Sequence, residues 1–478
     1  MERKITGRKP DALFLNFERI SAIPRPSFHE DRIADYLAAF AKERGFFALR
    51  DEAKNVFVRI PATPGMEEVP PILLQAHTDM VCEKNNGVEH DFMKDGIDLV
   101  VDGNYLRANG TTLGADDGIG VALAMTVIDG EIKRHPVVEC LFTASEEVGM
   151  GGVYDFDFSL ITARRMVNLD SADLGIITAG SCGGVRCDLT FTGTRETKTR
   201  RALKLTFSDF AGGHSGENIH EGRANAIRMM GLLLKELSDL PGFRVASIEG
   251  GGKTNAIPRE CSAVIGVDHP NAAEAAANAF AEQHLSTLLP IDKGASLTVE
   301  SAEDELCLSK EDGDRLIALL CKPRIGVIKM SEDVKGLVEW SQNLGVVKTE
   351  GDQISVLFSS RSAIEDQLED CVRELSTLAS ENGADIRIHN RYTGWEYAKQ
   401  SDLRERYLAA YKKALGKEAT VNIIHAGLEC GEIYGKIPGM DIISIAPTIK
   451  DLHSPTERLD LDSAEAFWLT FEELFRGL

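Results

Sequence analysis

The sequence predicts an α/β protein whose main domain is built around a mostly parallel β-sheet. Short apolar runs such as PPILLQ, VVECLFTA and RMVNL are typical of strands buried on both faces, and they alternate with amphipathic helical segments. Polar residues follow several of these runs directly, at the sheet edge where α/β folds place their functional sites. Because 478 residues exceed what one compact core holds, we expect at least two domains.

The first part of the main domain is predicted over residues 1–184. It opens with an amphipathic helix at 27–45, begun by a Ser27-x-x-Glu30 capping box and ended by Gly45. Two strands, a helix and two more strands should follow, at residues 55–60, 70–77, 119–130, 137–144 and 165–170. The glycine-rich AGSCGGV then marks the exit from this α/β layer.

Residues 185–394 show a different pattern, in which strands are paired with long helices. The first run comprises a strand, a helix, a strand and a helix, at 201–210, 221–240, 259–267 and 271–285. A second run comprises a strand pair, a helix and a strand, at 344–360, 363–379 and 384–390. This recurrence predicts an internally duplicated α+β domain inserted into the first one.

The α/β pattern resumes over residues 395–478. A helix, two strands and a final amphipathic helix are expected at 402–416, 419–425, 440–446 and 463–475. If this segment completes the first domain, His453 can lie beside residues from the beginning of the chain.

Composition excludes several classes of partner. The formal net charge of −22 would repel polyphosphate backbones and anionic lipid headgroups, so we expect neither nucleic acid nor membrane as a partner. The basic N-terminus lacks an apolar run, no segment approaches the roughly 18 apolar residues of a membrane span, and the nine cysteines include no C-x-x-C pair. A reducing, cytoplasmic location is therefore expected, with Cys182 and Cys187 as structural thiols.

Histidine and acidic residues recur at the ends of the predicted strands and in the loops beside them. In chain order they are His77, Asp79, Asp116, Glu146, Glu147, Asp170 and His453. Oxygen and nitrogen ligands without a thiolate suit two adjacent divalent ions better than a closed structural zinc site. We expect two ions per chain, zinc first, with cobalt or manganese as alternatives, and a di-metal hydrolase.

Two of these motifs have a simple geometry on a strand. In the H-x-D of QAHTDM the side chains point to the same side, so Asp79 can accept a hydrogen bond from the His77 nitrogen that faces away from the metal. Adjacent Glu146 and Glu147 cannot both face the same way in extended backbone. One should therefore be a ligand and the other a base or supporting group.

The GADDGIG motif contains two aspartates just before a predicted helix. Asp116 could bridge two cations with its two oxygens. Asp117 could instead be the ligand, or could cap the helix N-terminus, which is the role we favour for it.

The ordered set resembles the di-zinc metallopeptidases related to glutamate carboxypeptidase, aminoacylase and carnosinase. The motifs QAHTDMV, GTTLGADDGIG, TASEEVGMGG, GGHSGENI, GGGKTNAIP, HAGLECG and PTIKDLHSPTER are most similar to bacterial aminoacyl-histidine dipeptidases, also called Xaa-His dipeptidases or peptidase D. The resemblance covers nearly the whole chain. It implies a di-metal peptidase domain with an inserted lid domain.

The resemblance also implies roles for the acidic and histidine residues. His77 and Asp170 would complete one metal site, Glu147 and His453 the other, with Asp116 bridging ions roughly 3.5–4 Å apart. Glu146 would be the general base, taking a proton from the attacking water and later delivering one to the leaving amine.

The same resemblance extends to the inserted domain and the end of the chain. His214 in GGHSGEN would stabilise the oxyanion of the transition state. Asn255 and Arg361 would contact the substrate, the arginine by a bidentate pair with a dipeptide carboxylate, although an exposed structural arginine fits SSRSA equally well. His425 and Glu429 are expected in the catalytic domain, where substrate contact and loop support are equal alternatives.

These observations favour a metal-dependent dipeptidase acting on Xaa-His substrates such as β-alanyl-histidine. A broader dipeptidase and an amidohydrolase acting on N-acyl amino acids remain alternatives, because both need the same metals and the same bond cleavage. The presence of Glu146 argues against a non-catalytic binding protein. The expected partner is a small peptide, and a homodimer is preferred.

Overall fold

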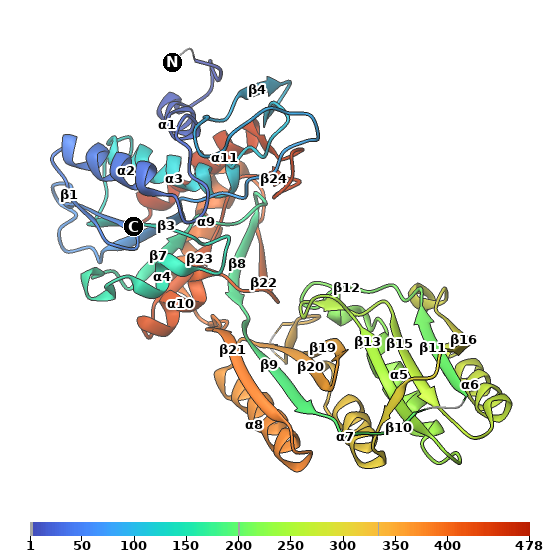
Figure 1. Ribbon diagram of the computed structural model, residues 1–478. Helices are drawn as coiled ribbons and strands as arrows, with labels where there is room; N and C mark the ends of the chain where they lie inside the picture. The colour runs from blue at the N-terminus through green and yellow to red at the C-terminus, as the bar shows by residue number, and fades with distance from the viewer. Residues whose placement is uncertain (1–2, 199–200, 333) are drawn as a thin grey trace. The chain divides into compact units, whose positions relative to one another are not determined.

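The chain forms two compact units, shown in a computed structural model that describes residues 3–198, 201–332 and 334–478 (Figure 1). Unit 1 consists of Met1–Gly180, Tyr397–Ile423 and Leu428–Leu478. Unit 2 consists of Ser181–Glu396 and Ile424–Gly427. Unit 2 is thus inserted between strands of unit 1, whose sheet joins segments from both ends of the sequence.

Unit 1 contains an eight-stranded sheet in the order β1-β2-β6-β3-β7-β23-β8-β22. In that order the strands are Phe47–Arg50, Val56–Ile60, Val138–Thr143, Ile72–His77, Arg165–Asn168, Asp441–Ser444, Ile176–Ser181 and Thr420–Ile424. The four central strands β6, β3, β7 and β23 run parallel. Strands β1, β2 and β8 pair antiparallel, so the sheet is mixed, and the predicted parallel arrangement holds at its centre.

Helices cover both faces of this sheet. The helices packed into the main core are α1 (Asp11–Ser21), α2 (Asp31–Glu43), α3 (Ala115–Ile128), α9 (Asp402–Leu415) and α11 (Leu461–Arg476). Alternate β3 residues Ile72, Leu74 and Ala76 point into that core. Gln75 points the other way and contacts Glu429, the first residue of α10 (Glu429–Lys436).

A second, four-stranded sheet in unit 1 was not predicted. Its order is β24-β25-β5-β4, with bounds Ile449–Lys450, Arg458–Asp460, Tyr105–Ala108 and Leu99–Asp102. Pairing of β25 with β5 attaches the segment after His453 to the segment before α3. The same strands therefore bring the C-terminal histidine towards the GADDGIG loop.

Unit 2 contains a nine-stranded sheet whose order is β16-β11-β15-β13-β19-β20-β9-β21, with β18 on β19. In that order the strands are Ser296–Ala302, Ala202–Ser208, Cys261–Gly266, Arg244–Gly250, Val338–Glu350, Gln353–Ser362, Gly183–Thr192, Asp385–Tyr392 and Gly326–Met330. Four strands lie on one side of the junction between β13 and β19, and four strands with the additional β18 lie on the other. Strands β13 and β19 pair at two positions, Glu249↔Lys348 and Gly250↔Val347. This arrangement is that of a duplicated α+β unit.

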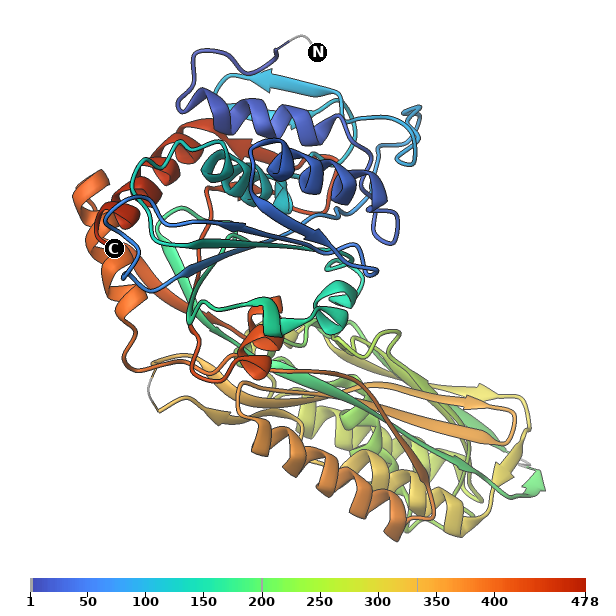
Figure 2. The same cartoon turned by 90° about the vertical axis from the view of Figure 1, so that its left-hand side faces the viewer.

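Four helices line one face of the unit 2 sheet (Figure 2). They are α5 (Ala226–Leu237), α6 (Pro270–Leu285), α7 (Lys310–Cys321) and α8 (Glu365–Glu381). The remaining short elements are α4 (Gly151–Asp155), β10 (Arg195–Lys198), β12 (Gly213–His214), β14 (Ala256–Ile257) and β17 (Leu306–Leu308).

Two predicted helix starts in the sequence are wrong. The helix expected from residue 221 begins at Ala226, because the Asn225 side chain accepts a hydrogen bond from Arg228 N at 3.0 Å. The helix expected from 27 begins at Asp31 with no side-chain cap, so Ser27 and Glu30 do not form a capping box. Both residues bind the functional site instead.

All nine cysteines are free thiols, and Cys182 and Cys187 are buried, as expected for structural thiols. Among the residues that the structure describes, no helix combines the length and apolar character that spanning a membrane requires.

Candidate di-metal site

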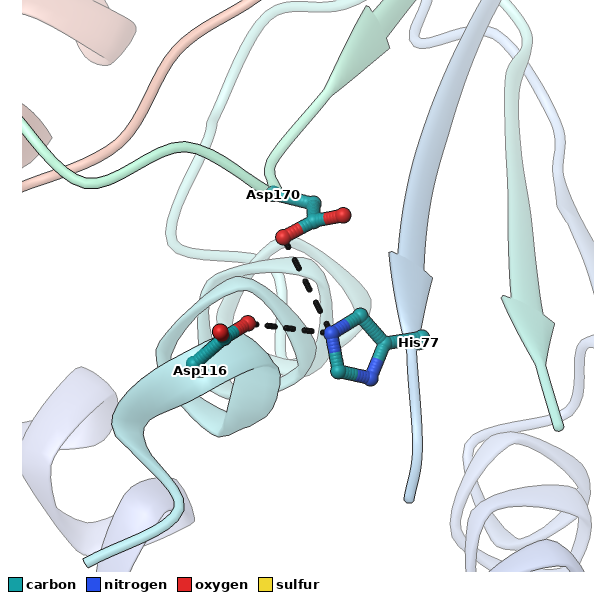
Figure 3. A group of neighbouring side chains, drawn as sticks. All are labelled: His77, Asp116 and Asp170. Carbon is teal, nitrogen blue, oxygen red and sulfur yellow. Dashed lines mark hydrogen bonds and ion pairs between the residues drawn. The ribbon is translucent and has the colours of Figure 1, made fainter. Parts of the chain in front are cut away.

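The end of β3 supplies the first histidine of the site. His77, the last residue of β3, is buried, and its Nε2 lies 3.0 Å from Asp116 Oδ1 and 3.8 Å from Asp170 Oδ1 (Figure 3). Its Nδ1 lies 3.2 Å from the Asp79 carbonyl oxygen and 3.5 Å from Asp79 Oδ1. One ring nitrogen therefore faces the acidic cluster and the other faces Asp79.

Asp116 lies between two histidines that come from opposite ends of the chain. Its Oδ1 contacts His77 Nε2 at 3.0 Å and its Oδ2 contacts His453 Nε2 at 3.1 Å. The two oxygens thus face two different groups of ligands. This geometry matches the arrangement expected of a bridging carboxylate.

The two glutamates after β6 and the aspartate after β7 complete the cluster. Glu147 Oε2 lies 3.1 Å from His453 Nε2, whose side chain is 52% exposed. Three sets of ligand atoms lie within 4.8 Å of one another: His77 with Asp116 and Asp170, His77 with Glu146 and Glu147, and Asp116 with Glu147 and His453. All five predicted ligands and Glu146 are therefore brought together.

The electrostatics of this cluster are those of a site for cations. Burial and neighbouring carboxylates raise the pKa of Glu146 to about 8 and raise the pKa of Asp170 well above its usual range. Hydrogen bonds that the His453 ring donates to Asp116 and Glu147 raise the pKa of His453 to about 10. Burial alone would lower the pKa of His77, but its carboxylate neighbours raise it well above the ordinary value.

The donor set suits two hard or borderline divalent ions. Imidazole nitrogens and carboxylate oxygens are zinc ligands, and no cysteine is among them. Glu147 Oε1 is buried without a hydrogen-bond partner, which leaves it free for a cation. Two cations would also relieve the repulsion among the crowded carboxylates.

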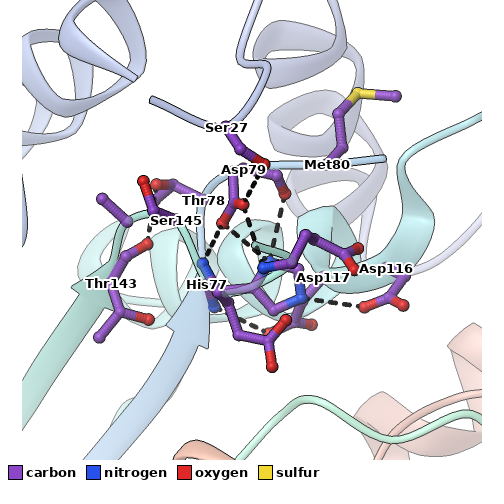
Figure 4. A network of polar contacts seen from close by, with 12 residues as sticks. Ser27, His77, Thr78, Asp79, Met80, Asp116, Asp117, Thr143 and Ser145 are labelled. Atoms are coloured by element: carbon purple, nitrogen blue, oxygen red, sulfur yellow. Dashed lines mark hydrogen bonds and ion pairs between the residues drawn. The ribbon is translucent and has the colours of Figure 1, made fainter. Parts of the chain in front are cut away.

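Asp79 lies beside Ser27 and His77 in a network of polar contacts (Figure 4), and it also holds the loop that carries the glutamates. It accepts hydrogen bonds from the backbone N–H groups of Glu146 at 3.0 Å and Glu147 at 3.2 Å, and from the Ser27 hydroxyl at 2.7 Å. Asp79 therefore positions both the His77 ring and the backbone of Glu146 and Glu147, a wider role than the H-x-D spacing predicted.

Glu30 holds the same loop one residue earlier. Its Oε1 accepts hydrogen bonds from Ser145 N at 2.9 Å and Ser145 Oγ at 2.7 Å. Ser145 has a φ of 56°, in the left-handed region that a non-glycine residue adopts only when its surroundings impose it. The residues predicted as a capping box therefore fix the turn before Glu146.

The backbone of α3 is non-helical at Asp116 and Asp117, and Asp117 caps the regular part of the helix that follows this kink, as predicted. Its Oδ1 accepts a hydrogen bond from Gly120 N at 3.2 Å, three residues ahead, and its Oδ2 accepts one from His77 N at 3.3 Å. A Cβ at Gly120 would lie 2.3 Å from Asp117 Oδ1, so the motif glycine is required. Asp117 does not join any of the three ligand groups.

Glu429 lies behind the parallel strands, on the α10 side of the sheet. It is fully buried, and its Oε2 accepts hydrogen bonds from Gln75 Nε2 and Thr143 Oγ1, each at 2.7 Å. Its Oε1 has no hydrogen-bond partner, and burial raises its pKa to about 7. One oxygen supports the strand ends and the other is available.

The remaining predicted residues lie in unit 2. Strand β12 pairs with β14, so His214 lies opposite Ala256, and Asn255 O accepts a hydrogen bond from Ser215 N at 2.9 Å. His214 Nδ1 accepts a hydrogen bond from Glu217 N at 3.2 Å, which leaves Nε2 as the N–H donor of the neutral ring. Burial and the nearby Arg361 lower the pKa of His214.

Arg361 is buried, 8% exposed, so the exposed structural role considered from the sequence is wrong. Its Nη1 donates to Tyr392 Oη at 3.0 Å, its Nε has no partner, and no ion pair to it occurs in the described part of the chain. A buried guanidinium without a carboxylate is suited to binding an anion.

His425 belongs to unit 2 and not, as expected, to the domain of the metal cluster. Its Nε2 lies 2.7 Å from Ser341 Oγ, and Cys182 N donates to the carbonyls on either side of it. Burial and Arg361 lower the pKa of His425 to about 3, so the ring is neutral. A Cβ at Gly216 would lie 2.5 Å from the His425 carbonyl oxygen, which explains this glycine of GGHSGEN.

Comparison with known proteins agrees with this geometry. A family model described as a peptidase dimerisation domain matches residues 208–293. The chain is 37% identical over 480 residues to the cytosol non-specific dipeptidase of Escherichia coli (strain K12), covering 99% of both proteins. The chain belongs to the M20 family of metallopeptidases. It is therefore a peptide-bond hydrolase, as predicted.

Two solved structures resemble this M20 peptidase over nearly its whole length. The aminoacylhistidine dipeptidase of Vibrio alginolyticus is 35% identical and superimposes with a TM-score of 0.93, covering 99% of this chain and 98% of that one. The aminopeptidase PepT of Bacillus cereus, at 17% identity, a TM-score of 0.57 and 98% and 99% coverage, shares the fold. M20 peptidases are dinuclear metal enzymes, which agrees with the donor groups assembled here.

Proposed function

We propose that this M20 peptidase hydrolyses dipeptides, with Xaa-His dipeptides as preferred substrates, and uses two zinc ions per chain. The observation that carries the proposal is the cluster of three overlapping ligand groups at the carboxyl ends of the parallel strands. The names of the Vibrio and E. coli relatives support an aminoacyl-histidine or a broader dipeptide preference, respectively.

The proposed ligands divide between two ions. His77 and Asp170 would hold one, Glu147 and His453 the other, and Asp116 would bridge them through the two oxygens that already face the two histidines. When bound, the two cations would supply an activated water and polarise the scissile carbonyl.

Glu146 is the proposed general base. Its backbone N–H is held by Asp79, so its carboxylate is presented to the cluster from a fixed turn. It removes a proton from the attacking water and passes a proton to the nitrogen of the leaving amine.

Glu429 is proposed to bind the substrate's free ammonium group. It is buried, one oxygen is unpartnered, and its charge acts on Glu146. A dipeptide carries an ammonium group that matches this oxygen, whereas an N-acyl amino acid carries none. This feature favours a dipeptidase over the amidohydrolase alternative.

The unit 2 residues are proposed to recognise negative charge on the substrate. Arg361 would bind the C-terminal carboxylate, and His214 Nε2 would donate to the oxyanion of the transition state. Neutral His425 and Asn255 are proposed as further substrate contacts. The match to a peptidase dimerisation domain supports a homodimer, and the cytosolic relative supports a cytoplasmic location.

The test is hydrolysis of a substrate panel by enzyme from which a chelator has removed the metal, assayed with and without added zinc. The panel holds β-alanyl-histidine, other Xaa-His dipeptides, Xaa-Ala dipeptides, tripeptides and N-acetyl amino acids. We expect zinc-dependent cleavage with the highest kcat/KM for Xaa-His dipeptides. Equal rates for all dipeptides would establish the broader activity, and preference for N-acetyl amino acids would overturn the proposal.

A further inference from the structure

A buried glutamate accepts hydrogen bonds from the loop that carries Asp116, the proposed bridging residue. Glu457 Oε2 accepts hydrogen bonds from Leu113 N at 2.8 Å and Gly114 N at 3.0 Å. Its Oε1 accepts hydrogen bonds from Ala115 N at 2.7 Å and Asp116 N at 3.3 Å. A single carboxylate, 2% exposed, therefore binds four consecutive backbone N–H groups that end at Asp116.

The opposite side of the same loop is held by Arg25. Its Nη2 donates to Gly114 O at 2.5 Å, and its Nη1 donates to Thr78 O at 2.9 Å and Asp79 O at 3.0 Å. A Cβ at Gly114 would lie 2.6 Å from this guanidinium, so the close approach requires glycine. Glu457 holds the amide groups of the loop while Arg25 ties a carbonyl to the end of β3.

Glu457 also belongs to the turn that carries His453. The Glu457 N–H donates to Ser454 O at 3.0 Å, and the next residue, Arg458, begins β25, which pairs with β5. One short turn therefore supplies both a histidine that contacts Asp116 Oδ2 and the carboxylate that fixes the Asp116 backbone. Glu457 therefore links two proposed ligands from distant parts of the chain, together with the pairing of β25 and β5.

We propose that Glu457 is a positioning residue for the di-metal site, which fixes Asp116 so that its two oxygens can serve two cations. The inference deepens the proposed function and rests on it. To offer both oxygens to cations, Asp116 must keep its backbone in one position. A carboxylate that accepts hydrogen bonds from four N–H groups holds this backbone more strongly than a neutral acceptor would. Partners that orient metal ligands typically contribute about 10–100-fold in metal affinity.

The test compares Glu457→Gln with Glu139→Gln by metal titration and spectroscopy. Glu139 is an equally buried glutamate of unit 1 that accepts hydrogen bonds from Thr162 N and Ala163 N but joins no ligand group. In Glu457→Gln the side-chain NH₂ group faces backbone N–H groups that need an acceptor, so the loop that carries Asp116 is no longer held. We therefore expect affinity for Co²⁺ to fall about 10–100-fold and the visible Co²⁺ spectrum to change. Glu139→Gln should lower Tm and leave both metal readouts as in the wild type.

Wild-type protein that fails to bind two ions would refute the proposed function itself. Wild-type binding of two ions together with unchanged Co²⁺ affinity and spectrum in Glu457→Gln would overturn only the role of Glu457. Equal loss of affinity in Glu139→Gln would also overturn it, because the effect would then be general destabilisation. If Glu457→Gln does not fold, Glu457→Asp keeps the charge but shortens the reach, and an unaltered Co²⁺ spectrum in it would likewise overturn the role.

Discussion

The candidate-site histidines of the two units, His77 and His453 in one and His214 and His425 in the other, lie in opposite electrostatic surroundings. In unit 1, carboxylates raise the pKa of His77 and His453, and the histidines are outnumbered by acidic groups. In unit 2, burial and Arg361 lower the pKa of His214 and His425. The surroundings in unit 1 therefore favour positive charge, whereas those in unit 2 favour a neutral imidazole ring.

The largest effect is expected from removing the carboxylate that joins the two proposed ions. Asp116→Ala should abolish activity and bind neither ion tightly, because one bridging carboxylate neutralises two cations. His453→Ala should chiefly weaken one ion. Metal content after dialysis measures both effects, and two tightly bound ions in Asp116→Ala would contradict the bridging role.

The next effect tests whether unit 1 does more than hold metal. Glu146→Ala should keep both ions and lose several orders of magnitude in kcat, since proton transfer and water positioning are lost while the ligands remain. Turnover and metal content are measured on the same preparation. Near-normal kcat in the metal-loaded variant would remove Glu146 from the role of base.

A smaller loss is expected when the neutral histidine of unit 2 is removed. His214→Ala should lower kcat about 10²–10³-fold with little change in KM, because the contact forms only with the oxyanion. His220→Ala, an exposed histidine in the same segment, is the matched control and should behave as wild type. A raised KM with unchanged kcat would show that His214 only binds substrate.

The smallest effect is expected on stability, from the buried carboxylate of Glu429 in unit 1. Burial raises the pKa of Glu429 in the folded protein to about 7, so the folded state favours the protonated carboxyl. Its contribution to the free energy of unfolding is therefore complete below the pKa of the unfolded chain and is lost as the pH rises through 7. In chelated protein, Glu429→Gln should therefore gain stability over wild type between pH 5 and pH 8, by at most on the order of 3 kcal/mol. Tm values at both pH values measure the gain, and an equal difference at both would contradict it.

The sequence was sufficient where a simple periodicity applies. Parallel strands end at one edge, so polar residues after PPILLQ, VVECLFTA and RMVNL could be predicted to meet, and His77, Glu147 and Asp170 do meet. The central strands and several helices of both units followed from the same apolar patterns. Other elements were missed. They include the longer elements α1, β9 and α7, the four-stranded sheet of unit 1, and α10. Short elements such as β25 and α10 have too few residues for a pattern.

Residues that act on backbone groups could not be predicted. Glu457, Arg25 and Glu30 bind N–H or carbonyl groups of loops far away in sequence, and such contacts leave no spacing to recognise. Ser27 and Glu30 illustrate the reverse error. Their spacing is that of a capping box, but in the folded chain Ser27 donates to Asp79, and Glu30 accepts hydrogen bonds from Ser145, just before the two glutamates.

The inserted position of unit 2 also governs how the protein can be made. Strand β23 pairs in parallel with β7, yet the ribosome reaches β23 only after all of unit 2 up to residue 396 has been synthesised. At about 5–20 residues per second, the edge of β7 remains unpaired on the order of tens of seconds. Nascent chains paused within unit 2 already carry His77, Asp116 and Asp170 but lack His453, so we expect them to complete at most one of the two proposed metal sites. The last ligand to emerge, His453, marks the moment at which the enzyme can become active.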